Sequence, residues 1–188
     1  MKPYLVLYAT RDGHTAKVAQ HLVETIEKRD LPTKLENADQ LPADLSLREY
    51  QGAILAASVH VRHHEAEMMR FVKQYREGLE KMPTVFLSIS LSEAGAEDED
   101  APPEKRAKAA ADAQGMIDAF LQETQWHPTK IKAVAGALLY TKYNFLIRLV
   151  MKRIAKQARG DTDTSRDYDY TDWAALDRLV DELVKPAS

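Results

Sequence analysis

Short apolar runs alternate with amphipathic helical patterns along the 188-residue chain, and this alternation constrains the fold more than any other feature. Such alternation is typical of βαβ units, which build a parallel sheet covered by helices. The apolar runs predict five strands, at 4–8, 34–37, 52–57, 84–90 and 131–137. The periodic segments predict helices that begin near Thr15 and span about 65–79, 103–122 and 173–184. We therefore expect one α/β domain over 1–188, with a doubly wound parallel sheet of order 2-1-3-4-5.

In a sheet of this order, ligands bind at the carboxyl ends of the strands, where the strand order reverses. That point lies between the first and third strands. The segments to inspect are the expected loops 9–14, 58–64 and 91–97, the last of which opens an acidic stretch at 93–100.

The first of these loops has the composition of a phosphate site. Its residues are Thr10, Arg11, Asp12, Gly13, His14 and Thr15. Free backbone N–H groups and the positive end of the helix dipole attract phosphate there, the threonine hydroxyls add donors, and glycine allows a close approach. The alternative is an ordinary strand–helix turn with a threonine cap. The pattern matches neither GxxxxGK[ST] nor GxGxxG, which argues against a nucleoside triphosphatase or a dinucleotide site.

The loop also resembles that of a known family. The pattern Thr10-x-x-Gly13-x-Thr15 resembles the phosphate loop of flavodoxins. The string TRDGHT resembles one branch, the flavodoxin-type protoporphyrinogen oxidases or quinone-dependent protoporphyrinogen IX dehydrogenases. Matching motifs continue in the family's order: Ala57-Ser58, Met82-Pro83, Gln125-Trp126, AGAL at 135–138 with Tyr140 and Tyr143, GDTDT at 160–164 and YTDW at 170–173. GDTDT and YTDW together are the most specific of these.

This resemblance implies a flavodoxin-like fold with bound FMN, and oxidation of protoporphyrinogen IX to protoporphyrin IX in haem biosynthesis. The reaction would take three two-electron steps, and a membrane quinone would accept the electrons. The alternatives are a flavodoxin-like quinone reductase with another donor and a flavodoxin-like FMN electron carrier without a substrate of its own. The quoted motifs specify neither the quinone type nor the oligomeric state.

The resemblance places the flavin ring against the second and third loops. The implied contacts are Ser58, Val59 and His60 from one loop and Ser88, Ile89, Ser90 and Leu91 from the other. Neither loop contains the aromatic residue with which flavodoxins commonly cover the ring. An uncovered ring is accessible to a large planar substrate, so this composition favours catalysis over electron shuttling.

Four polar residues of the second loop, His60, Arg62, His63 and His64, predict a cationic group beside the flavin. Positive charge there would stabilise reduced flavin or bind substrate carboxylates. A solvated loop is the alternative, and the spacing does not define a metal site. No general base can be named. His60 and His63 are candidates only because imidazole titrates near neutral pH.

A basic insert, about 138–164, precedes the last helix. Residues 144–157 predict an amphipathic helix whose apolar face carries Leu146, Ile147, Val150, Met151 and Ile154. The basic residues Arg148, Lys152 and Lys156 share another face. This helix would bind an anionic membrane surface or, with Arg62, Tyr140 and Tyr143, the substrate; the alternative is a helix packed on the domain.

Charge and composition support a peripheral membrane contact. Segment 126–160 carries eight basic and no acidic residues, while the whole chain has a net charge of −3, so the remainder carries −11. No stretch approaches the roughly 18 apolar residues of a membrane span. The chain has no cysteine, which fits a reducing compartment. We therefore expect a cytoplasmic protein at the cytoplasmic face of the membrane. No nucleic-acid motif is present.

Three positions depart from the family's pattern. Leu139 stands where arginine is expected, Arg159 precedes Gly160 where a second glycine is common, and no aromatic residue follows Arg62. All three lie toward the implied substrate side of the flavin.

Overall fold

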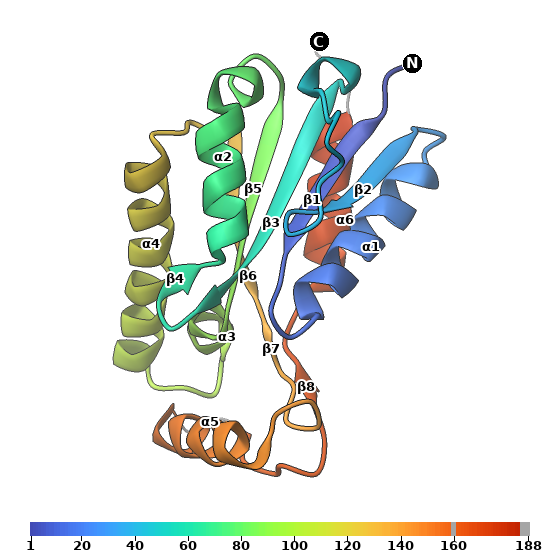
Figure 1. The fold of residues 1–188 in the computed structure, drawn as a ribbon. Helices are drawn as coiled ribbons and strands as arrows, with labels where there is room; N and C mark the ends of the chain where they lie inside the picture. The colour runs from blue at the N-terminus through green and yellow to red at the C-terminus, as the bar shows by residue number, and fades with distance from the viewer. Residues whose placement is uncertain (159–160, 185–188) are drawn as a thin grey trace.

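The computed structural model describes residues 1–158 and 161–184, and it gathers the expected strands into one twisted parallel sheet (Figure 1). These strands are β1 (Tyr4–Ala9), β2 (Thr33–Asn37), β3 (Gly52–His60), β5 (Thr84–Ser90) and β6 (Lys130–Ala135). Their order is β2-β1-β3-β5-β6, with the short β4 (His63–His64) attached to β3. Counting the five long strands alone, this is the predicted order, and the doubly wound sheet is confirmed.

Helices cover both faces of the sheet (Figure 1). The main helices are α1 (His14–Glu27), α2 (Ala66–Leu79), α4 (Pro103–Thr124) and α6 (Trp173–Val184), and a 3₁₀ turn forms at Leu47–Glu49. Because side chains alternate along a strand, Val6 and Ile54 pack toward α1 and α6, whereas Leu5 and Leu55 pack toward α2 and α4. Burying each such side chain contributes about 1.5–3 kcal/mol. Two cores therefore fix the strands, and with them the loops at their carboxyl ends.

The second and third segments expected as loops are more regular than predicted. Strand β3 continues to His60, turns through Val61 (φ 47°) and Arg62 (φ 66°), and pairs antiparallel with β4. A two-residue turn with both φ values positive closes a hairpin, so the expectation of a loop over 58–64 is wrong. Helix α3 (Leu91–Glu97) likewise replaces most of the acidic loop, because the Ser90 side chain accepts a hydrogen bond from the Glu93 N–H and caps the helix (3.1 Å).

The insert forms a separate small layer across the carboxyl ends of the strands (Figure 1). The predicted helix is present as α5 (Phe145–Ala158), and an unpredicted antiparallel pair, β7 (Ala137–Leu138) and β8 (Tyr168–Asp169), joins the insert to the domain. Leu138, Tyr140, Tyr143 and Ala155 form its own small core. Within 1–158 and 161–184, no helix has the length and apolarity needed to cross a membrane.

Candidate functional site

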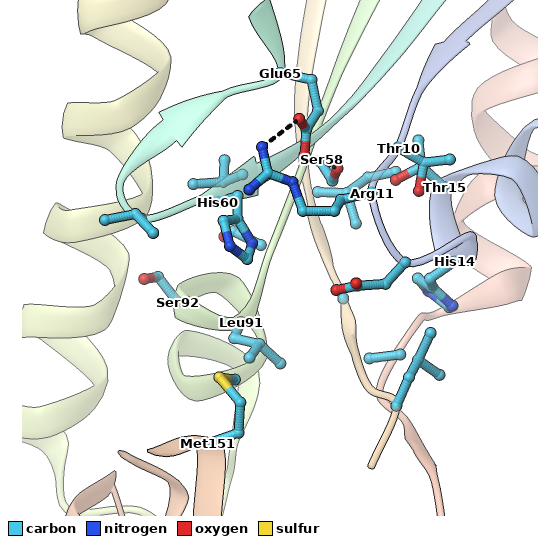
Figure 2. A pocket seen from close by; sticks show the side chains of 18 of the residues that line it. Thr10, Arg11, His14, Thr15, Ser58, His60, Glu65, Leu91, Ser92 and Met151 are labelled. Atoms are coloured by element: carbon cyan, nitrogen blue, oxygen red, sulfur yellow. Dashed lines mark hydrogen bonds and ion pairs between the residues drawn. The ribbon is translucent and has the colours of Figure 1, made fainter. Parts of the chain in front are cut away.

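A cavity of about 570 Å³ lies where the sheet order reverses, between the strand ends and the insert (Figure 2). Among the predicted flavin contacts, those lining it are Thr10, Arg11, Asp12, His14, Thr15, Ser58, Val59, His60, Ile89, Ser90 and Leu91. Gly13 and Ser88 belong to the same loops but do not line the cavity. The structure therefore brings most of the predicted contacts together around one space.

The first loop turns sharply into α1 at Gly13. Gly13 has φ 89°, a conformation that favours glycine, and its N–H donates to the Thr10 hydroxyl oxygen at 3.0 Å. Within the described part of the chain, the N–H groups of His14, Thr15 and Ala16 donate no hydrogen bond. Three donors at the positive end of the helix dipole are therefore free to bind an anion.

Thr15 supplies a further observation that favours an anion here. Its side chain is 1% exposed, yet its hydroxyl oxygen has no hydrogen-bond partner among the described residues. A buried hydroxyl without a partner costs about 1–3 kcal/mol. A phosphate bound at the loop would satisfy this hydroxyl together with the free N–H groups, so the residues present fit the phosphate of FMN.

Thr171 of the YTDW motif forms a hydrogen bond with His14 of the phosphate loop. The Thr171 hydroxyl donates to the Ala135 carbonyl (2.9 Å), so its oxygen accepts the hydrogen bond from His14 Nε2 (2.8 Å). Burial lowers the pKa of His14, with Lys17 and Lys142 adding to the effect and Asp169 opposing it. His14 is therefore a neutral, anchored residue at neutral pH.

Sequence reasoning missed a buried carboxylate in the cavity wall. Glu65, 6% exposed, accepts from the Ser58 hydroxyl at 3.1 Å and from Arg11 Nη2 at 3.4 Å (Figure 2). Arg11 thus crosses from the phosphate loop to the start of α2. Glu65 lies at the start of a predicted helix, but no local pattern indicates its contact with residues 54 and seven positions away.

The histidine-rich segment does not form one cationic group. His60 and Arg62 line the cavity, and Arg62 pairs with Asp112 at 3.4 Å. His63 is exposed and does not line the cavity. His64 is buried among Phe86 and Phe120, with its Nε2 2.9 Å from the Ser88 hydroxyl. Burial, assisted by His63, lowers the pKa of His64 to about 4, so the expectation of positive charge at His64 is wrong.

The insert, rather than the second and third loops, provides the remaining wall. Cavity-lining side chains from it are Leu139, Tyr143, Leu146, Ile147, Val150 and Met151. Tyr143 gives the cavity the aromatic ring that those two loops lack. The apolar periodicity of α5 was visible in the sequence, but its placement over the cavity was not.

Other candidate residues of the insert lie away from the cavity. Tyr140 is fully buried in the insert's core and donates to the Asp161 carbonyl at 2.7 Å. Arg148 donates to the carbonyls of Tyr140 and Tyr143 at 3.0 and 3.1 Å, whereas Lys152 is exposed. The Lys156 side chain and Arg159 lie outside the described residues. The basic face predicted from the sequence is therefore divided, because Arg148 supports the turn before α5.

Comparison with known proteins identifies similar chains over almost the whole length. A family model described as a flavodoxin domain matches residues 5–165. A protoporphyrinogen IX dehydrogenase [quinone] of Escherichia coli K12 is 28% identical over 95% of this chain and 93% of its own. One from Leishmania major is 30% identical over 95% of this chain and 73% of its own. A solved short-chain flavodoxin associated with a bacterial microcompartment superposes over 100% of both chains with a TM-score of 0.53 and 13% identity, a likeness of fold alone.

Proposed function

The chain belongs to the flavodoxin domain family, and from this premise we propose that it binds FMN and oxidises protoporphyrinogen IX to protoporphyrin IX, with a quinone as electron acceptor. The observation that carries the proposal is the match, over 95% of this chain, to relatives named for that reaction. The unpartnered Thr15 hydroxyl beside three free N–H groups supports the cofactor independently.

The residues of the cavity fit distinct parts of this reaction. When bound, FMN supplies the capacity to accept two electrons at a time. The Thr15 hydroxyl and the N–H groups that begin α1 would hold its phosphate. The insert offers Leu146 and Val150, which line the cavity, as an apolar wall for a planar macrocycle. Arg62, in the turn between β3 and β4, also lines the cavity and would bind a substrate carboxylate in competition with Asp112.

An anaerobic assay of the purified protein with protoporphyrinogen IX and a quinone tests this function. We expect stoichiometric FMN, a rise in porphyrin fluorescence above the uncatalysed rate, and dependence of that rise on the quinone. Bound FMN with no such rise would contradict the proposed reaction. Rapid quinone reduction with another donor would then support a quinone reductase, whereas slow reaction with every small acceptor would support an electron carrier.

The proposal includes contact with an anionic membrane, where a quinone dissolved in lipid is reached. Phe145 and Leu149 of α5 are 77% and 58% exposed, and neither lines the cavity. Lys152 and Arg153 are exposed on the same helix. Exposed apolar and basic side chains on one helix beside the cavity suit an anionic lipid surface, and we place the protein peripherally at such a surface.

Replacing Phe145 and Leu149 together with serine is expected to weaken binding to phosphatidylglycerol vesicles by at least about tenfold, because both side chains then bury no apolar area in the lipid. Vesicle co-sedimentation at fixed ionic strength measures the effect. Replacing Ile131, another exposed apolar residue, with serine is the matched control and should leave binding intact. Equal binding by the double variant and the parent would contradict membrane contact through α5.

A further inference from the structure

One lysine of the insert reaches the phosphate loop. Lys142 Nζ donates to the Asp12 carbonyl at 3.2 Å, and a Cβ placed on Gly13 would lie 3.3 Å from the same nitrogen. Lys142 is 130 positions from Asp12 in the sequence. A cation from the insert is therefore held directly beside the turn that begins α1.

The other basic side chains around this loop are already paired with carboxylates or neutral. Arg11 pairs with Glu65 at 3.4 Å, and Lys17 pairs with Asp169 at 2.8 Å. His14 is held neutral by burial. Within residues 1–158 and 161–184, no carboxylate lies within ion-pair distance of Lys142. A phosphate monoester carries about −1.5 to −2 charges at neutral pH, and Lys142 is the nearby cation left to balance it.

Hydrogen bonds hold the backbone on both sides of Lys142. The Lys142 N–H donates to the Leu139 carbonyl at 3.0 Å. The neighbouring Thr141 donates to Asp167 from both its N–H and its hydroxyl, at 2.8 Å each. On the other side, the buried Tyr143 accepts a hydrogen bond from Arg148 at its carbonyl. This anchoring reduces the backbone entropy lost when the lysine binds an anion.

We propose that Lys142 binds the FMN phosphate from the insert, so that the cofactor is held by the first loop and by the insert together. This inference rests on the proposed binding of FMN. It gives the insert a role in cofactor retention in addition to forming the wall of the cavity.

The test compares FMN with riboflavin, which lacks the phosphate. Apoprotein with Lys142→Met is expected to bind FMN about five- to tenfold more weakly than the parent, the effect of one partly solvated charge. Its affinity for riboflavin should not change. Lys142→Arg keeps the charge and should restore the ratio of the two affinities. Flavin fluorescence titration gives both dissociation constants.

Lys81→Met is the control for net charge, because Lys81 is exposed between α2 and the start of β5, whereas the phosphate loop lies at the carboxyl ends of the strands. It should leave the affinity ratio unchanged. If Lys142→Met leaves the ratio of FMN to riboflavin affinity unchanged, including by weakening both equally, the role of Lys142 is overturned while FMN binding stays established. Failure of the parent to bind either flavin would instead overturn the proposed function, and this inference with it.

Discussion

Replacing Thr15 with valine is expected to weaken FMN binding by about 10- to 100-fold, the loss of one hydrogen bond to a charged group. Valine has nearly the shape of threonine, so the fully buried site keeps its packing. The same change should stabilise the apoprotein, because the Thr15 hydroxyl is buried without a partner there. We expect the free energy of unfolding of the apoprotein to rise by about 1 kcal/mol.

Lower FMN affinity combined with higher apoprotein stability distinguishes a ligand-binding hydroxyl from one that stabilises the fold. FMN affinity is measured by fluorescence titration, and apoprotein stability by urea denaturation. Thr25→Val is the matched control: Thr25 is also buried in α1, but its hydroxyl already donates to Asp177 at 3.0 Å. That variant should lose stability and keep its FMN affinity. Unchanged FMN affinity in Thr15→Val would contradict a phosphate bound at this hydroxyl.

The sheet was predictable because each strand is indicated by the hydrophobicity of its own short run of residues. The run GAILAA at 52–57 is wholly apolar and became the buried part of β3, while the polar run at 34–37 became the edge strand β2. The loop between β1 and α1 was recognisable from Thr10, Gly13 and Thr15. The pattern Ser90-x-x-Glu93 is a local capping signal that indicates the start of α3.

The rest of the site depends on contacts between distant residues. Arg11 meets Glu65, and Lys142 meets Asp12, across 54 and 130 positions respectively. The apolar face of α5 has helical periodicity whether it covers a cavity, the domain or a membrane. The hairpin turn was not expected because Val61, a β-branched residue, rarely adopts a positive φ. Tertiary packing decides each of these features, and no local pattern encodes them.

His64 makes folding dependent on pH. Burial holds its pKa near 4 in the folded protein, whereas an unfolded histidine titrates near 6.5. Between these values the unfolded chain binds the proton and the folded protein does not. The contribution of neutral His64 to the free energy of unfolding is therefore fully present above about pH 6.5 and is lost as pH falls toward 4. This loss amounts to about 3 kcal/mol.

Urea denaturation between pH 4 and 7 measures this contribution as the difference between the parent and a double variant, His64→Phe with Ser88→Ala. The double variant keeps an aromatic ring against Phe86 and Phe120 and leaves no buried hydroxyl without its partner. Its stability relative to the parent should rise by about 3 kcal/mol as pH falls through this window. His127→Asn, which removes an exposed histidine elsewhere in the chain, should follow the parent. If the free energy of unfolding instead depends on pH equally in the parent and the double variant, His64 can carry a proton in the folded protein. That result would support the positive charge at His64 that the sequence predicts.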